Sequence, residues 1–235
     1  MIIDFIDASL EEIPLSKPYS IAYKTTSSIK NLLVKIVLKN GVYGLGAASV
    51  SKYVVGVDTQ EAFSAAKDYQ NCLVGKNISE VFKNIEAVEK DLSFNPGARA
   101  AFNIAIHDVY CKHTNISLGS LLGHKTSPLP TSVTVGIKSI SETIAEIEEY
   151  LADGFKNIKI KLGEEVEKDI ERILKVQERF GNSIVVRIDA NQGWSFEETL
   201  AFVGAVKNIE LIEQPLSINS SEEYLQFPKE VKKLI

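Results

Sequence analysis

Residues 155–162 read FKNIKIKL and have the alternation of a β-strand. Successive side chains of a strand point to opposite faces of its sheet, so Ile158, Ile160 and Leu162 share one face while Lys159 and Lys161 share the other. Charged side chains are costly to bury unless they are paired or bound to a metal. The two lysines therefore mark this strand as a candidate for chemistry.

Two later runs repeat the pattern. Residues 185–191 read VVRIDAN and residues 209–215 read IELIEQP, and amphipathic segments separate the three runs. Strands that alternate with helices form a parallel sheet with right-handed crossovers. In a parallel βα barrel the active site collects at the C-terminal ends of the strands. We therefore expect Lys161, Asp189 and Glu213 to lie together at one end of the sheet.

The pattern also has a structural interpretation. The charged side chains could form an ion-pair layer inside the barrel, or the polar faces of the strands could meet solvent. Three successive strands carry the pattern at the same end, which favours a functional site.

The composition favours small-molecule chemistry in the cytoplasm. The chain has 235 residues, 45% of them hydrophobic, and a net charge of −5, so neither nucleic acid nor an anionic membrane is an expected partner. Cys72 and Cys111 lack metal-ligand spacing and are expected to be reduced core residues. The N-terminus lacks the pattern of a signal peptide, and no apolar run reaches transmembrane length.

The chain divides into two predicted domains, at residues 1–127 and 128–235, with Pro128-Leu129-Pro130 as the link. The first is an α+β domain. It has a hairpin over 32–49 that turns at Asn40-Gly41, and helices over 59–73, 78–92 and 96–113. The second is α/β with about four βα units, and three Ser-x-x-Glu pairs predict helix starts at Ser139, Ser195 and Ser220.

The charged residues predict a metal site with a lysine base. Asp189 and Glu213 offer hard oxygen ligands without histidine or cysteine, which implies Mg²⁺ or Mn²⁺. A lysine beside a divalent cation and a second lysine has its pKa lowered and becomes a general base. This pairing suits proton abstraction beside a carboxylate, because the ion stabilises the developing negative charge.

The sequence resembles the enolase superfamily, in its muconate-lactonising branch, and most closely the dipeptide epimerases of the Ala-Glu type. The resemblance rests on the motifs KIK at 159–161, RIDANQGW at 187–194 and IEQP at 212–215. It implies a capping domain, here 1–127, followed by a (β/α)₇β TIM-like barrel. It also implies that Lys161 is an acid/base with Lys159 as its electrostatic neighbour, that Asp189 and Glu213 bind Mg²⁺, and that Thr134 contacts the substrate.

Lys24 departs from the family pattern. It stands where the Ala-Glu epimerases carry an arginine that holds the distal substrate carboxylate. Lysine keeps the charge but loses the bidentate geometry. We expect Lys24, on a loop over 19–30, to bind an anionic group of a dipeptide.

The resemblance also bears on the length of the barrel. The family's third metal-binding aspartate and second catalytic lysine would lie beyond Ile235. The chain is therefore expected to be truncated midway through the barrel and inactive alone. Unpaired strand edges at 131–137 and 209–213 predict a homo-oligomer.

The function expected from these observations is that of a Mg²⁺-dependent racemase or epimerase that abstracts the proton α to a carboxylate. Two alternatives stay open. One is a relative such as o-succinylbenzoate synthase or muconate cycloisomerase, since the lysine pair is common to both. The other is a non-catalytic truncated remnant.

Overall fold

The computed structural model describes the backbone of residues 1–21, 24–124, 128–220 and 222–235. Within these ranges, the side chains of Lys17, Tyr19, Ser20, Ile21, Lys24 and Thr25 are outside the description. The chain separates into two compact units. Unit 1 comprises Met1–Ser16 and Ser28–Ser127, and unit 2 comprises Lys17–Ser27 and Pro128–Ile235.

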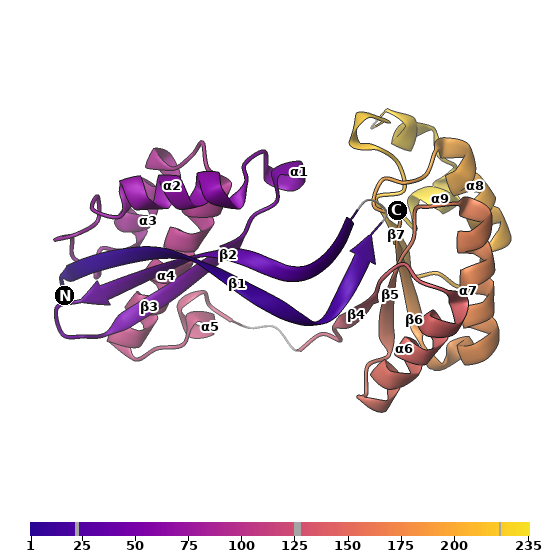
Figure 1. Ribbon diagram of the computed structural model, residues 1–235, viewed down its shortest axis with the longest axis horizontal. Coiled ribbons are helices and arrows are strands. Elements are labelled where there is room, and N and C mark those ends of the chain that lie inside the picture. The colour runs from indigo at the N-terminus through magenta and orange to yellow at the C-terminus, as the bar shows by residue number, and fades with distance from the viewer. Residues whose placement is uncertain (22–23, 125–127, 221) are drawn as a thin grey trace. The chain divides into compact units, whose positions relative to one another are not determined.

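Unit 1 contains helices and most of a three-stranded sheet, since residues 17–21 of its first strand and 24–27 of its second belong to unit 2. The strands β1 (Ile3–Ile21), β2 (Lys24–Leu38) and β3 (Tyr43–Ser49) lie in the order β1-β2-β3, and β2 and β3 are antiparallel (Figure 1). The helices are α1 (Lys52–Val55), α2 (Thr59–Tyr69), α3 (Val81–Asp91), α4 (Pro96–Thr114) and α5 (Leu118–Leu121). The expected hairpin and the three expected helices are confirmed.

The sequence analysis expected a loop over residues 19–30, and this expectation is wrong for the described residues of that stretch. Residues up to Ile21 continue β1, and Lys24 is the first residue of β2. Pro14 and Pro18 do not end β1, because β1 is an edge strand of its sheet and proline is tolerated there. The segment is also rich in β-branched and aromatic residues, which favour strands.

A close contact between β3 and α4 organises the core of unit 1. A Cβ built on Gly46 would lie 1.9 Å from the carbonyl oxygen of Ala101, and one on Gly44 would lie 2.3 Å from the nitrogen of Val109. The facing side of α4 is made of small buried residues, among them Ala98 and Ala105. Glycines and alanines thus let a strand and a helix approach backbone to backbone.

Unit 2 is a parallel α/β layer. Its strands β4 (Ser132–Val135), β5 (Asn157–Lys161), β6 (Val185–Asp189) and β7 (Leu211–Glu213) are parallel and adjacent in chain order. The helices α6 (Ile140–Ala152), α7 (Val166–Phe180) and α8 (Phe196–Ala205) lie on one face of this sheet (Figure 1). Side chains from that face of the strands and from the helices form one buried core, which includes Ile158, Ile160, Ile188, Ile147, Ile173 and Phe202. The mixed α/β fold with a four-stranded parallel sheet is as expected.

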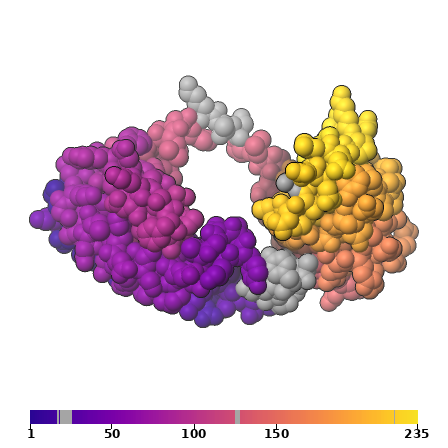
Figure 2. Space-filling model, turned by 90° about the horizontal axis from the view of Figure 1, so that it is seen from above, coloured from indigo at the N-terminus to yellow at the C-terminus, as the bar shows by residue number. Residues whose placement is uncertain are grey.

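Helix starts in unit 2 follow the predicted capping boxes in two of three cases. The side chains of Ser139 and Ser195 each accept a hydrogen bond from the backbone nitrogen three residues later. The side chains of Glu142 and Glu198 in turn accept one from the backbone nitrogens of these serines. The helix start expected at Ser220 is wrong for the described residues, in which the short 3₁₀ turns η2 (Ile218–Ser220) and η3 (Glu223–Gln226) precede Pro228 and α9 (Lys229–Lys232). This last segment (yellow) covers part of the surface of unit 2 (Figure 2).

Two further observations concern the sequence expectations. Both cysteines are free, and Cys111 is buried, but Cys72 is exposed and not a core residue. Among the described residues, no helix has both the length and the apolar character needed to cross a membrane.

The contact between β3 and α4 predicts that Gly46→Ala destabilises unit 1 by roughly 1–3 kcal/mol, the usual effect of overpacking a core. The added methyl meets backbone, which cannot move aside as a side chain would. The measurement is urea unfolding, with amide hydrogen exchange along α4 as the local readout. Gly119→Ala is the matched control, because its nearest neighbour is the side chain of His124 at 3.4 Å. Equal stability of the two variants would contradict the packing argument.

Candidate active site

The register of unit 2 brings the predicted charged residues into one row. Lys161 is paired with Asp189, and Asp189 with Glu213, so the ends of β5, β6 and β7 are aligned. Paired residues of parallel strands project from the same face. Along β5 the burial alternates, with Ile158 and Ile160 buried and the lysines half-buried. The site therefore lies on the face of the sheet opposite α6, α7 and α8, at the C-terminal ends of the strands.

Four side chains form a continuous ionic cluster, which we call the strand-end cluster: Lys159, Lys161, Asp189 and Glu213. Lys159 Nζ lies 2.8 Å from Asp189 Oδ2 and 2.6 Å from Glu213 Oε2. Lys161 Nζ lies 2.6 Å from the same Asp189 oxygen. Asp189 is 2% exposed, whereas Glu213 is 46% exposed. The cluster is thus closed at its centre and open at Glu213.

The electrostatics of the cluster favour charged groups. Burial acts to raise the pKa of Asp189, but hydrogen bonds from Lys159 and Lys161 outweigh it, so the pKa lies below its usual value. Burial acts to lower the pKa of Lys159, but the bonds to Asp189 and Glu213 outweigh it and raise that pKa. Asp189 is therefore a carboxylate at neutral pH, and Lys159 is an ammonium ion.

The carboxylates match the chemistry of a hard divalent ion. Asp189 and Glu213 lie on adjacent strands, and Lys159 contacts a carboxylate oxygen of each, so the two carboxylates lie close together. Mg²⁺ is commonly bound by one or two carboxylates and several waters. Within the described ranges, no group of three or more His, Cys, Asp or Glu side chains is arranged to hold a metal. Two protein ligands from this chain fit Mg²⁺ and do not fit a structural zinc site.

The loops after β6 and β7 are bound to each other. The backbone nitrogens of Ala190, Gln192 and Trp194 donate to Glu213, Gln214 and Pro215, respectively. Asn191, Gln192 and Gln214 adopt positive φ angles, as sharp turns at strand ends require. The nitrogen of Asn191 also donates to Asp189 Oδ1 at 3.0 Å, which orients that carboxylate. The backbone next to both carboxylates of the cluster is therefore held by hydrogen bonds.

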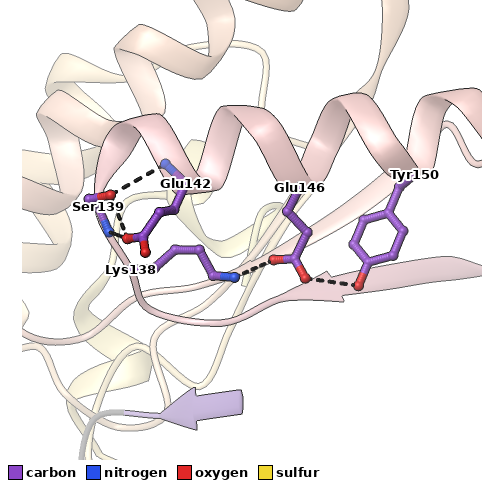
Figure 3. Close-up of polar contacts among 5 residues, drawn as sticks. All are labelled: Lys138, Ser139, Glu142, Glu146 and Tyr150. Atoms are coloured by element: carbon purple, nitrogen blue, oxygen red, sulfur yellow. Dashed lines mark hydrogen bonds and ion pairs between the residues drawn. The ribbon is translucent and has the colours of Figure 1, made fainter. Parts of the chain in front are cut away.

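The segment after β4 is fixed by contacts that the sequence analysis did not select. Lys138 Nζ donates to Glu146 at 2.7 Å, and the Tyr150 hydroxyl donates to the other oxygen of Glu146 at 3.2 Å (Figure 3). Ser139 and Glu142 cap the start of α6 beside them (Figure 3). The signal was available in the sequence, since Glu146 and Tyr150 are spaced i, i+4 on one side of a predicted helix.

Two predicted substrate contacts have different outcomes. Thr134 is exposed and paired with Lys159 in the β4–β5 register, so it lies on the same face as the strand-end cluster. The side chain of Lys24 lies outside the described residues, and its role stays a prediction.

The sequence analysis also missed Asp169, a fully buried carboxylate near the start of α7. Its Oδ2 accepts from the nitrogen of Gly163 and from the indole nitrogen of Trp194. A signal was present, because Asp169 lies at i+3 from Val166 and therefore on the apolar side of the predicted helix.

The chain is similar in sequence to proteins that are named as epimerases. It is 40% identical over 227 residues to the L-Lys-D/L-Arg epimerase of Desulforapulum autotrophicum, covering 95% of this chain and 64% of that protein. It is 37% identical over 234 residues to the L-Lys-D/L-Arg epimerase of Methylococcus capsulatus, covering 98% of this chain and 65% of that protein. The chain thus spans somewhat less than two thirds of the length of these relatives.

Comparison of the fold with solved structures also finds a dipeptide epimerase. The crystal structure of the Methylococcus capsulatus dipeptide epimerase complexed with Mg and the dipeptide L-Arg-D-Lys superposes with a TM-score of 0.94 at 35% identity. The match covers all of this chain and 67% of that one.

Two family models cover most of the sequence. Residues 6–123 match the N-terminal domain of mandelate racemase / muconate lactonizing enzyme, and residues 142–232 match the enolase C-terminal domain-like family. The first of these matches alone spans half of the chain. The chain belongs to the mandelate racemase / muconate lactonizing enzyme family of the enolase superfamily.

Proposed function

We propose that this chain carries part of the active site of a Mg²⁺-dependent dipeptide epimerase, in which Lys161 transfers the proton at the carbon α to a carboxylate. The observation that carries the proposal is the alignment of Lys161, Asp189 and Glu213 at the ends of three adjacent parallel strands. The relatives named as epimerases, and the Mg complex of one of them, support the same chemistry.

Each residue of the strand-end cluster has a role in this proposal. Asp189 and Glu213 hold the Mg²⁺ ion, which when bound supplies positive charge beside the substrate carboxylate. Lys161, 15% exposed, exchanges the α proton. Lys159 keeps a positive charge beside Lys161. Thr134 positions the substrate from β4.

The substrate is a dipeptide in this proposal, and two classes compete. The two relatives described above are named for lysine- and arginine-containing dipeptides, which favours cationic side chains. The charge of Lys24 favours an anionic group instead, as expected from the sequence. We propose the cationic class, because similarity over the whole chain outweighs one residue. The proposal retains the cytoplasmic location and the homo-oligomer expected from the sequence.

The direct test is exchange of the substrate α proton with solvent deuterium, followed by NMR, for cationic, neutral and anionic dipeptides. Epimerisation needs a base on each face of the α-carbon, but exchange of the α proton needs only Lys161. We therefore expect Mg²⁺-dependent exchange, without interconversion of the epimers, that chelation abolishes. Lys161→Arg keeps the positive charge beside Asp189 but cannot release a proton, so exchange is expected to fall by roughly 10²–10⁴-fold, the usual contribution of a general base. Lys156→Arg, at an exposed position before β5, is the matched control.

Three outcomes would reject parts of this proposal. Exchange that survives in Lys161→Arg would exclude Lys161 as the base. Elimination or cycloisomerisation without α-proton exchange would favour the related enzymes considered from the sequence. No exchange with any dipeptide would leave the 235-residue chain non-catalytic.

A second prediction concerns the metal. Asp189→Asn and Glu213→Gln each remove one charged oxygen ligand, so each is expected to weaken Mn²⁺ or Mg²⁺ binding by about 100-fold or more, since even residues behind the ligands contribute about 10- to 100-fold. Electron paramagnetic resonance of free Mn²⁺ measures the affinity. Glu210→Gln is the control, because this glutamate precedes β7 and pairs with Arg187. Unchanged affinity in either ligand variant would refute the metal assignment.

A third prediction separates the substrate classes. If Lys24 contacts the distal side chain, Lys24→Ala raises KM for anionic dipeptides and lowers it for cationic ones, because a like charge is removed. The ratio of the two KM values is the measurement. An equal effect on both classes would mean that Lys24 is a solvated surface residue.

A further inference from the structure

A buried carboxylate joins the two loops that follow the residues of the strand-end cluster. Asp169 Oδ2 lies 2.9 Å from the backbone nitrogen of Gly163 and 3.1 Å from Trp194 Nε1. Gly163 is two residues beyond Lys161, and Trp194 is five residues beyond Asp189. We call these three residues the Asp169 bridge. A single oxygen atom on α7 thus accepts from the loop after β5 and from the loop after β6.

The two loops are also in direct backbone contact. A Cβ on Gly163 would lie 2.0 Å from the carbonyl oxygen of Ala190, and a Cβ on Gly193 would lie 2.1 Å from that of Gly163. The nitrogen of Leu162 donates to the carbonyl oxygen of Asp189 at 2.9 Å, which extends the β5–β6 ladder. The loops that follow β5 and β6 are therefore in direct contact next to the aligned strand ends.

Stability alone gives little reason for this carboxylate. Asp169 is 0% exposed, and burial raises its pKa although the N–H donors and Arg172 act against it. Arg172 Nη1 lies 3.6 Å from Asp169 Oδ1, and in the described part of the chain neither of these two atoms has a hydrogen-bond partner. A buried, incompletely bonded ion pair contributes less to stability than an apolar replacement would.

We propose that Asp169 is a positioning residue, which holds the loops after β5 and β6 together and so sets Lys161 against Asp189. The roles of Lys161 and Asp189 rest on the proposed function. The bridge itself rests on the two hydrogen bonds that Asp169 Oδ2 accepts. α7, which carries Asp169, packs beside α6 and α8 on the helical face of the sheet (Figure 1). Asp169 therefore contacts the two loops from the helical side of the sheet.

The single tryptophan of the chain makes the bridge measurable. Trp194 is 3% exposed, and its indole N–H gives one cross-peak in a ¹H–¹⁵N spectrum. Asp169→Asn keeps the shape of the side chain but removes its charge. It also replaces one carboxylate oxygen by an NH₂ group, and both of these oxygens face N–H groups in the wild type. We expect the indole peak to move, the Leu162 amide to exchange faster with solvent, and Mn²⁺ affinity to fall by about 10- to 100-fold, as for partners behind metal ligands.

Two other variants complete the experiment. Asp153→Asn makes the same chemical change at an exposed position after α6 and should leave all three readouts as in the wild type. Trp194→Phe keeps an aromatic ring beside Phe202, whose ring centroid lies 4.6 Å from that of Trp194, and removes the indole N–H donor. It should weaken Mn²⁺ binding by about tenfold, the low end of the same range. If Asp169→Asn fails to fold, this variant decides the question.

The outcomes separate the bridge from the proposed function. A moved indole peak with unchanged Leu162 exchange and Mn²⁺ affinity, or wild-type affinity in Trp194→Phe, would overturn the positioning role. A wild-type chain that binds neither Mn²⁺ nor Mg²⁺ would instead refute the proposed function. The exchange rate of the Leu162 amide would then still test the bridge.

Discussion

The parallel register of β5, β6 and β7 is the constraint on which the site depends. Pairing of Lys161 with Asp189 and of Asp189 with Glu213 brings together charges that are 28 and 24 residues apart in sequence. A slip of one residue would turn each of these side chains to the helical face. The apolar alternation prevents the slip, because it would also move Ile158, Ile160 and Ile188 out of the core. The hydrophobic pattern of the strands thus positions the polar site.

We propose that the ionic cluster serves the proposed function and is not a structural layer. A structural ion-pair layer inside a barrel is expected to be sealed, so that its charges interact in a low dielectric. Here Asp189 is sealed, but Glu213 is nearly half exposed and Lys159 is 21% exposed. Exposed pairs contribute little to stability. Asp189 is thus a buried anchor, and the contribution of the Lys159–Glu213 pair to stability is small.

The features of the fold and site that could be predicted from the sequence are those that depend on local periodicity. Alternation of period two placed Lys159, Lys161, Asp189 and Glu213 on one face, and the Ser139 and Ser195 capping boxes fixed the starts of two helices. The edge position of β1, which lets Pro14 and Pro18 stay within a strand, is set by sheet order and has no local signal. The partners of Asp169 lie 6 and 25 residues away, so its role depends on tertiary contacts.

The charge balance of the strand-end cluster limits what it can recognise. In the proposed function, a bound divalent ion adds two positive charges to the strand-end cluster. In the same proposal, such a site attracts the carboxylate next to the reacting carbon of a dipeptide. A distal side chain more than a Debye length from the cluster would be largely screened from it, whatever its sign. We therefore propose that substrate class is decided by residues away from the strand ends, so that the chemistry and the specificity are carried by different parts of the sequence.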